Sequence, residues 1–145
     1  MRLLNLGISL FLCSSLPAFA GPAPQKEIFM HNGSTMMVDY QEQTIRYLVP
    51  KRSLPVVSPQ MSFAGRLEYH GKAEGIAYVY KRGCGFVYYD VKGHYDPAIP
   101  GYVLTGAAPV RAKRGCDVIG YTMNSPNSRL IYVEMPNQED FFGDL

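Results

Sequence analysis

The chain of 145 residues has no tryptophan, three histidines and three cysteines. It carries no Gly-x-Ser-x-Gly elbow, no His-Glu-x-x-His motif and no glycine-rich phosphate loop. Those patterns are typical of hydrolases, zinc proteases and nucleotide-binding proteins. The histidines, His31, His70 and His94, fall in expected turns or loops, and His94-Tyr95-Asp96 offers at most half of a metal site. We therefore expect no enzyme, no catalytic residue, no metal and no cofactor.

Charge is scarce as well. Charged residues make up 18% of the chain, and the formal net charge is +2. A nucleic-acid-binding domain typically carries a dense basic face and a much higher net charge. We therefore expect no nucleic-acid partner.

The N-terminus has the pattern of a signal peptide. Arg2 gives a basic start, residues 3–16 are largely apolar, and Ala18-Phe19-Ala20 is a small-x-small cleavage site. The apolar run is too short to span a bilayer. Cys13 follows a leucine instead of the small residue that lipoprotein processing requires, so we expect no lipidation. The prediction is cleavage after Ala20, a periplasmic or secreted protein and no membrane span.

One short motif occurs twice in the remaining chain. Lys81-Arg82-Gly83-Cys84 recurs as Lys113-Arg114-Gly115-Cys116, and strand-like residues follow each copy. In an oxidising compartment, two cysteines normally pair. A Cys84–Cys116 disulfide closing a loop of about 33 residues would stabilise the fold by roughly 3–4 kcal/mol in the chain-entropy model. The alternative is two free buried thiols.

Short strands separated by turns dominate the sequence after the leader. Asn32-Gly33 lies between two apolar runs, which is a strong hairpin signal. Residues 61–69 alternate between apolar and polar, and the prolines of residues 50–59 indicate a loop. We predict an all-β fold without a helix after the signal peptide, a small antiparallel sandwich or barrel of about eight or nine short strands.

These patterns divide the chain into four parts. The expected parts are a signal peptide (1–20), a flexible arm (21–27), a single β domain (28–136) and an acidic flexible tail (137–145) that contains Phe141-Phe142.

The doublet also supplies the candidate binding residues. A Cys84–Cys116 bond would bring the two basic pairs to one end of the sheet, with Tyr80 and Tyr121 nearby. The candidates are Lys81, Arg82, Lys113, Arg114, Tyr80 and Tyr121. Such a patch suits an anionic polymer or an acidic protein surface. The alternative is that charged turns only keep the sheet ends soluble.

The chain resembles a family of uncharacterised exported proteins from alphaproteobacteria. The matching elements cover most of the mature chain and include His31-Asn32-Gly33-Ser34, Ile45-Arg46-Tyr47, Pro50-Lys51, Phe63-Ala64-Gly65-Arg66, Gly75-Ile76-Ala77-Tyr78-Val79-Tyr80, Cys84-Gly85, Tyr89-Asp90-Val91, Leu104-Thr105-Gly106 and Cys116. The resemblance implies export and a compact β module, and it implies no established activity.

The expected function is that of a non-enzymatic cell-envelope domain that binds a protein or an anionic glycan through its basic end. The alternative is an inhibitor of an exported hydrolase, in which a disulfide-braced loop plugs an active site. Small periplasmic lysozyme inhibitors are likewise β-rich and disulfide-tied, so this alternative rests on analogy.

Overall fold

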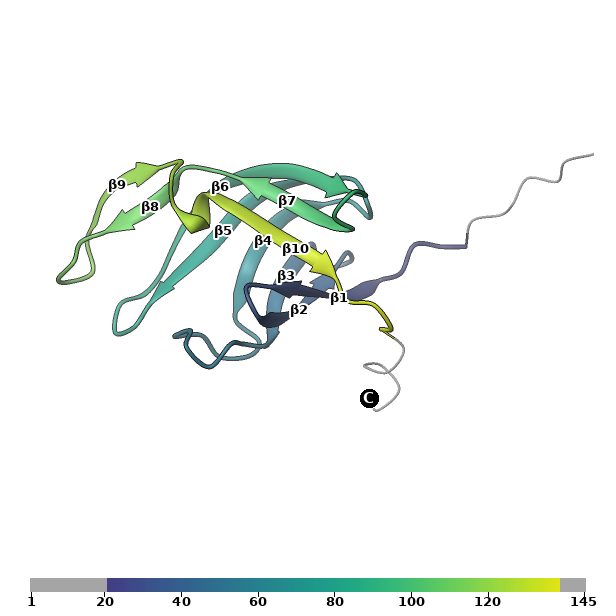
Figure 1. Cartoon of the computed structure of the whole chain (residues 1–145), viewed down its shortest axis with the longest axis horizontal. Helices are drawn as coiled ribbons and strands as arrows, with labels where there is room; N and C mark the ends of the chain where they lie inside the picture. Colours follow the sequence, from purple (N-terminus) through teal and green to yellow (C-terminus); the bar gives the residue numbers. More distant parts are fainter. Residues whose placement is uncertain (1–20, 139–145) are drawn as a thin grey trace, which may run out of the picture.

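A computed structural model describes residues 21–138, and there it contains ten strands and one short 3-10 turn, Pro126–Ser128 (Figure 1). The expected signal peptide and residues 139–145 of the expected tail lie outside the described residues. The strands are β1 (Lys26–His31), β2 (Ser34–Asp39), β3 (Thr44–Val49), β4 (Met61–Leu67), β5 (Lys72–Lys81), β6 (Gly85–Asp96), β7 (Gly101–Thr105), β8 (Ala108–Arg111), β9 (Val118–Thr122) and β10 (Arg129–Glu134).

Eight of these strands form a closed antiparallel barrel in the order β1-β10-β7-β6-β5-β4-β3-β2, and β8 and β9 pair separately as a two-stranded sheet. The all-β antiparallel prediction is confirmed, and the choice between sandwich and barrel is settled in favour of the barrel. The strand that the sequence did not predict is β8. It contains Pro109, which lacks an N–H donor and is therefore tolerated on a strand with only one partner.

The barrel closes where its first and last strands meet. Phe29 of β1 pairs with Glu134 of β10, and Met30 pairs with Val133. Beyond that short register, the backbone N–H of Met135 donates to the Ile28 carbonyl at 2.9 Å. The Gln138 side chain accepts from the N–H of the same Ile28 and donates to its carbonyl. Closure leaves neither terminal strand with an unpaired edge.

Alternate residues of the strands fill the barrel interior. The largest fully buried side chains of this core are Tyr102, Tyr132, Phe29, Phe63, Met36, Ile45, Leu67, Leu104 and Val38. An eight-stranded barrel is just wide enough to be filled by side chains. The buried Tyr132 hydroxyl forms a hydrogen bond of 2.8 Å with the Ser62 hydroxyl. The interior is therefore a packed core.

The domain begins slightly earlier and ends slightly later than the sequence suggested. Lys26 and Glu27 already belong to β1. The Lys26 ammonium lies 3.3 Å from the Asp39 carboxylate on β2 and so holds this end of the strand in place. The backbone N–H of Tyr40 also donates to the Gln25 carbonyl. At the other end, Gln138 is held against β1 as described above. Among residues 21–138, no helix has the length and apolar character to cross a membrane.

The β5–β6 hairpin is longer than the barrel wall to which it belongs. β4 pairs with β5 only over Ala73–Ala77, and β7 pairs with β6 only over Lys92–Asp96. The remaining part, Tyr78–Lys81 with Gly85–Tyr88, is therefore a two-stranded arm. It reaches the same end of the molecule as the β8–β9 hairpin (Figure 1).

A testable consequence concerns the close contact of β4 and β5. Gly65 and Gly75 face each other across the strands, and a Cβ on Gly75 would lie 2.3 Å from the Ala64 carbonyl oxygen. Gly75→Ala should therefore lower the free energy of unfolding by about 1–3 kcal/mol, the usual cost of overpacking. Urea denaturation measures the change.

Gly120→Ala on β9 is the matched control, since a Cβ there meets nothing within 4 Å. Equal stability losses in the two variants would contradict the close approach of β4 and β5.

Candidate functional site

The predicted disulfide is present and joins the turns of two hairpins. Cys84 in the β5–β6 turn and Cys116 in the β8–β9 turn are bonded, with their Cα atoms 5.3 Å apart. Gly83 and Gly115, directly before the two cysteines, have φ of 78° and 79°. Glycine adopts this left-handed conformation without steric cost. The repeated Lys-Arg-Gly-Cys motif is thus one turn geometry used twice.

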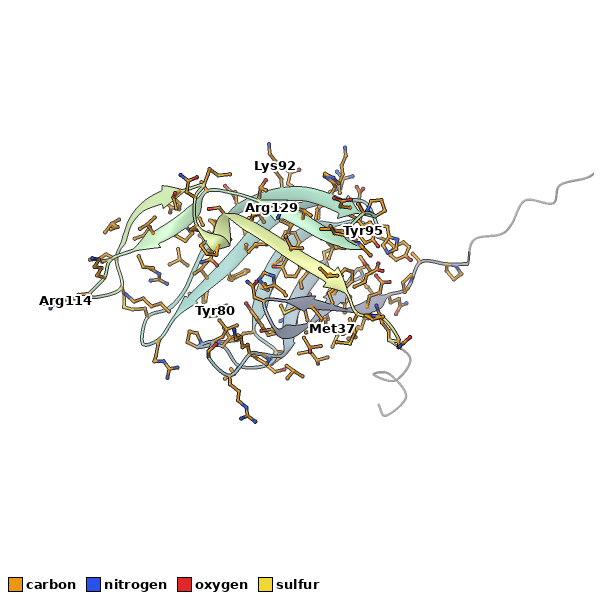
Figure 2. All side chains as sticks on the ribbon, in the orientation of Figure 1. Met37, Tyr80, Lys92, Tyr95, Arg114 and Arg129 are labelled. Atoms are coloured by element: carbon orange, nitrogen blue, oxygen red, sulfur yellow. A yellow bond between two sulfur atoms is a disulfide. The ribbon has the colours of Figure 1, made fainter. Side chains whose placement is uncertain are left out.

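The four cations of the doublet fall into two groups. The Lys81 ammonium donates to the carbonyls of Ala112 and Gly115 at 2.9 and 2.7 Å, so Lys81 bridges the two hairpins. Arg82, Lys113 and Arg114 are exposed, and none of them takes part in an ion pair among the described residues. We call these three residues the tip cations. Figure 2 shows Arg114 at the far end of the β8–β9 hairpin.

An aromatic row covers one face of the β5–β6 arm. Tyr80 lies opposite Phe86 and Tyr78 opposite Tyr88, and cross-strand partners project to the same side. The ring centroids of Tyr78 and Phe86 are 5.3 Å apart, and those of Tyr80 and Phe86 are 6.0 Å apart. Phe86 and Tyr88 remain 54% and 59% exposed. This row presents a large apolar area to solvent.

Tyr80, a predicted binding residue, has a mainly structural position. Its hydroxyl donates to the Met61 carbonyl at 2.7 Å, and its ring packs edge-on against Tyr47. Burial, and then the neighbouring Tyr47, raises the pKa of the Tyr80 hydroxyl. Tyr80 therefore anchors the arm to the barrel.

The second hairpin continues the apolar surface. Ile119 and Tyr121 alternate on β9 and are 68% and 61% exposed. Tyr121 and Tyr88 line the same surface hollow of about 410 Å³. We call Tyr78, Phe86, Tyr88, Ile119 and Tyr121 the hairpin face. The tip cations lie at its outer end.

A further hollow of about 400 Å³ lies between the tip of the arm and the proline-containing loop after β3. Arg82 and Phe86 line it on one side, and Leu54, Pro55 and Val57 line it on the other. Val57 is itself 66% exposed. The combination of apolar surface and an arginine therefore extends beyond the two hairpins.

The sequence predicted the doublet, Tyr80 and Tyr121, and it missed Phe86, Tyr88 and Ile119. Their exposure could not be predicted, because an apolar strand residue is normally buried. No local pattern marks them as exposed, because their exposure depends on how far the neighbouring strands β4 and β7 extend.

A second group of polar side chains lies at the other end of the barrel. Its members are Glu27 of β1, His70 of the β4–β5 turn and Glu134 of β10, together with Tyr40, Tyr95 and Tyr102. We call it the polar cluster. Tyr95, labelled in Figure 2, lies at the end opposite Arg114.

Short hydrogen bonds connect the polar cluster. His70 Nε2 lies 2.6 Å from Glu134 Oε1, and the Tyr95 hydroxyl donates to that same oxygen at 2.8 Å. The Tyr40 hydroxyl donates to Glu27 Oε2 at 2.5 Å. Burial raises the pKa of the Glu27 carboxyl, as does the Glu134 charge, while the Tyr40 hydrogen bond and His70 lower it. The net direction is upward.

No family model, curated protein or solved structure matches this chain. The function is therefore inferred from the geometry. Exposed aromatic and aliphatic groups beside uncompensated cations suit adhesion to an acidic, partly apolar surface.

The raised pKa of Glu27 makes a prediction about stability. The pKa of this carboxyl in the unfolded chain is near 4.5, and the pKa in the folded protein is higher. As the pH rises through this window, the unfolded state loses its proton first, so the folded state loses stability. Glu27→Gln cannot ionise. The free energy of unfolding of the variant, relative to that of wild type, should therefore increase as the pH rises from 4 to 7. Urea denaturation in EDTA measures the change.

Glu74→Gln, at an exposed position on β5, is the control and should show no such gain. A Glu27→Gln effect of the same size at both pH values would show that ionisation of Glu27 does not oppose folding.

Proposed function

We propose that the protein is an exported, non-enzymatic binding module of the cell envelope that docks its hairpin face and tip cations onto an acidic protein surface. The observation that carries this proposal is the combined exposure of Phe86, Tyr88, Ile119 and Tyr121 on two hairpins joined by a disulfide. Contiguous exposed apolar patches are rare on proteins that bind nothing. The leader pattern supports export.

The chemistry of the hairpin face favours a protein over a glycan. Tyrosine, phenylalanine, methionine and arginine are enriched in protein interfaces. Ile119, Phe86 and the nearby Met123 have no group that hydrogen-bonds a sugar hydroxyl, and each is more than half exposed. The tip cations would then meet carboxylates of the partner, which favours association at low ionic strength.

The shape of the tip supports a second candidate, an inhibitor of an exported hydrolase. The arm ends in the turn around Gly83, beyond the strands of the barrel wall, and the disulfide holds it in place. A protruding turn with arginine at its apex fits an acidic active-site cleft. Loss of lysozyme activity on mixing with the protein is the test that separates an inhibitor from a binder.

Charge reversal tests the main proposal. Arg82→Glu, Lys113→Glu and Arg114→Glu together should abolish retention of envelope protein on the immobilised mature domain and remove its salt dependence. Lys81 is left in place, since it bridges the hairpins. Tyr88→Ser with Tyr121→Ser should weaken binding about tenfold or more, as expected for interface aromatics.

The matched control reverses Lys72, Lys92 and Arg129, which are exposed elsewhere on the barrel. This control should bind as wild type does, and thermal denaturation should show all variants folded. Retention that survives protease treatment of the extract would assign the partner to a glycan. If the tip variant binds as strongly as wild type with unchanged salt dependence, the proposal is wrong, and the charged turns only keep the ends of the sheet soluble.

A further inference from the structure

The register of the closing strands brings two carboxylates together at one end of the barrel. Glu134 lies opposite Phe29, whose side chain is fully buried in the core. Glu27 precedes Phe29 by two positions and therefore points to the same face of the sheet. Both glutamates thus reach the mouth of the barrel from inside, and Glu27 is only 9% exposed.

His70 completes a three-ligand arrangement. One ligand atom from each of Glu27, His70 and Glu134 lies within 4.8 Å of the other two. Ligands about 2.0–2.2 Å from a tetrahedral zinc ion lie about 3.4 Å from one another, so these atoms would have to approach by up to ~1.4 Å. Small side-chain rotations would bring all three to bonding distance.

The histidine is held firmly by its surroundings. Its ring stacks between the rings of Tyr69 and Tyr95, with both centroid distances at 4.0 Å. Its backbone N–H donates to the Tyr102 hydroxyl at 3.0 Å, and that hydroxyl donates to the Glu68 carbonyl. An imidazole fixed in this way gives up little conformational freedom when it binds a ligand.

Hydrogen bonds from tyrosine hydroxyl groups orient both carboxylates. Tyr40 donates to Glu27 and Tyr95 donates to Glu134. Hydrogen bonds to the ligating carboxylates are typical of protein metal sites, where they fix the ligands and tune the ion.

The two carboxylates of the polar cluster also favour binding of a cation. Among the described residues, only the Tyr40 hydroxyl donates to the Glu27 carboxylate, and no ammonium or guanidinium group pairs with it. A buried carboxylate beside a second one is costly unless a positive charge compensates both. Within residues 21–138, the one basic side chain that pairs with Glu134 is His70.

We propose that Glu27, His70 and Glu134 bind a divalent first-row transition ion of the zinc class at the barrel mouth. One imidazole nitrogen and two carboxylate oxygens suit zinc, cobalt or manganese better than calcium or magnesium, which prefer oxygen ligands alone. Three protein ligands leave further coordination positions for water.

The ion would join residues from three elements. Glu27 lies on β1, His70 follows β4, and Glu134 lies on β10, so the ion bridges the short β1–β10 seam and the β4–β5 turn. Binding to the folded state alone raises its stability, and above Kd the gain grows with the logarithm of the ion concentration.

The test is calorimetric titration of the untagged, EDTA-treated mature protein with Zn²⁺, together with absorption spectroscopy of Co²⁺. We expect one ion per chain, cobalt ligand-field bands and a melting temperature that rises with Zn²⁺. His70→Asn should abolish all three effects, and asparagine tolerates the positive φ of 46° at this position. Tyr40→Phe should weaken binding ~10- to 100-fold.

His94→Gln is the matched control and should bind as wild type does, since this exposed histidine lies outside the polar cluster. Thermal denaturation in EDTA verifies that each variant folds. Absence of stoichiometric binding of Zn²⁺, Co²⁺ and Mn²⁺ would overturn the proposal. Equal Zn²⁺ affinity in wild type and His70→Asn, or loss of binding in His94→Gln, would overturn it as well.

Discussion

The covalent bond between Cys84 and Cys116 fixes the end of the molecule on which the proposed function depends. It joins two segments that consist of only two strands each: the arm of β5 and β6, and the separate β8–β9 hairpin. A two-stranded ribbon alone is marginal in water. The bridging ammonium of Lys81 adds two hydrogen bonds across the same junction. The hairpin face is therefore continuous because both tips are tied.

The barrel gives this surface a rigid base and separates it from the polar cluster. Closure pairs every strand of the wall on both sides, and Tyr80 fastens the arm to that wall through the Met61 carbonyl. The apolar and basic groups lie at one end, while Glu27, His70 and Glu134 lie at the other. A partner bound at the hairpins and an ion bound at the barrel mouth would not compete for the same residues.

Local patterns in the sequence predicted much of the fold. The Asn32-Gly33 turn connects β1 and β2 as expected, and the two Lys-Arg-Gly-Cys copies predicted both the turns and the disulfide. Features that depend on residues far apart in the sequence could not be predicted from such local patterns. Glu27 and Glu134 become neighbours only through the register that closes the barrel. The exposure of Tyr88 follows from how far β7 extends along β6, and no single segment encodes that length.

Hydrogen exchange followed by mass spectrometry tests the role of the disulfide most directly. In Cys84→Ser/Cys116→Ser, amides of β8, β9 and the arm (Tyr78–Lys81 and Gly85–Tyr88) should exchange much faster than in wild type. Amides of the barrel strands β1–β4 and β10 should keep their protection, because their hydrogen bonds do not depend on the hairpins. Unchanged protection of β8 and β9, or equal loss of protection over the whole barrel, would contradict this account.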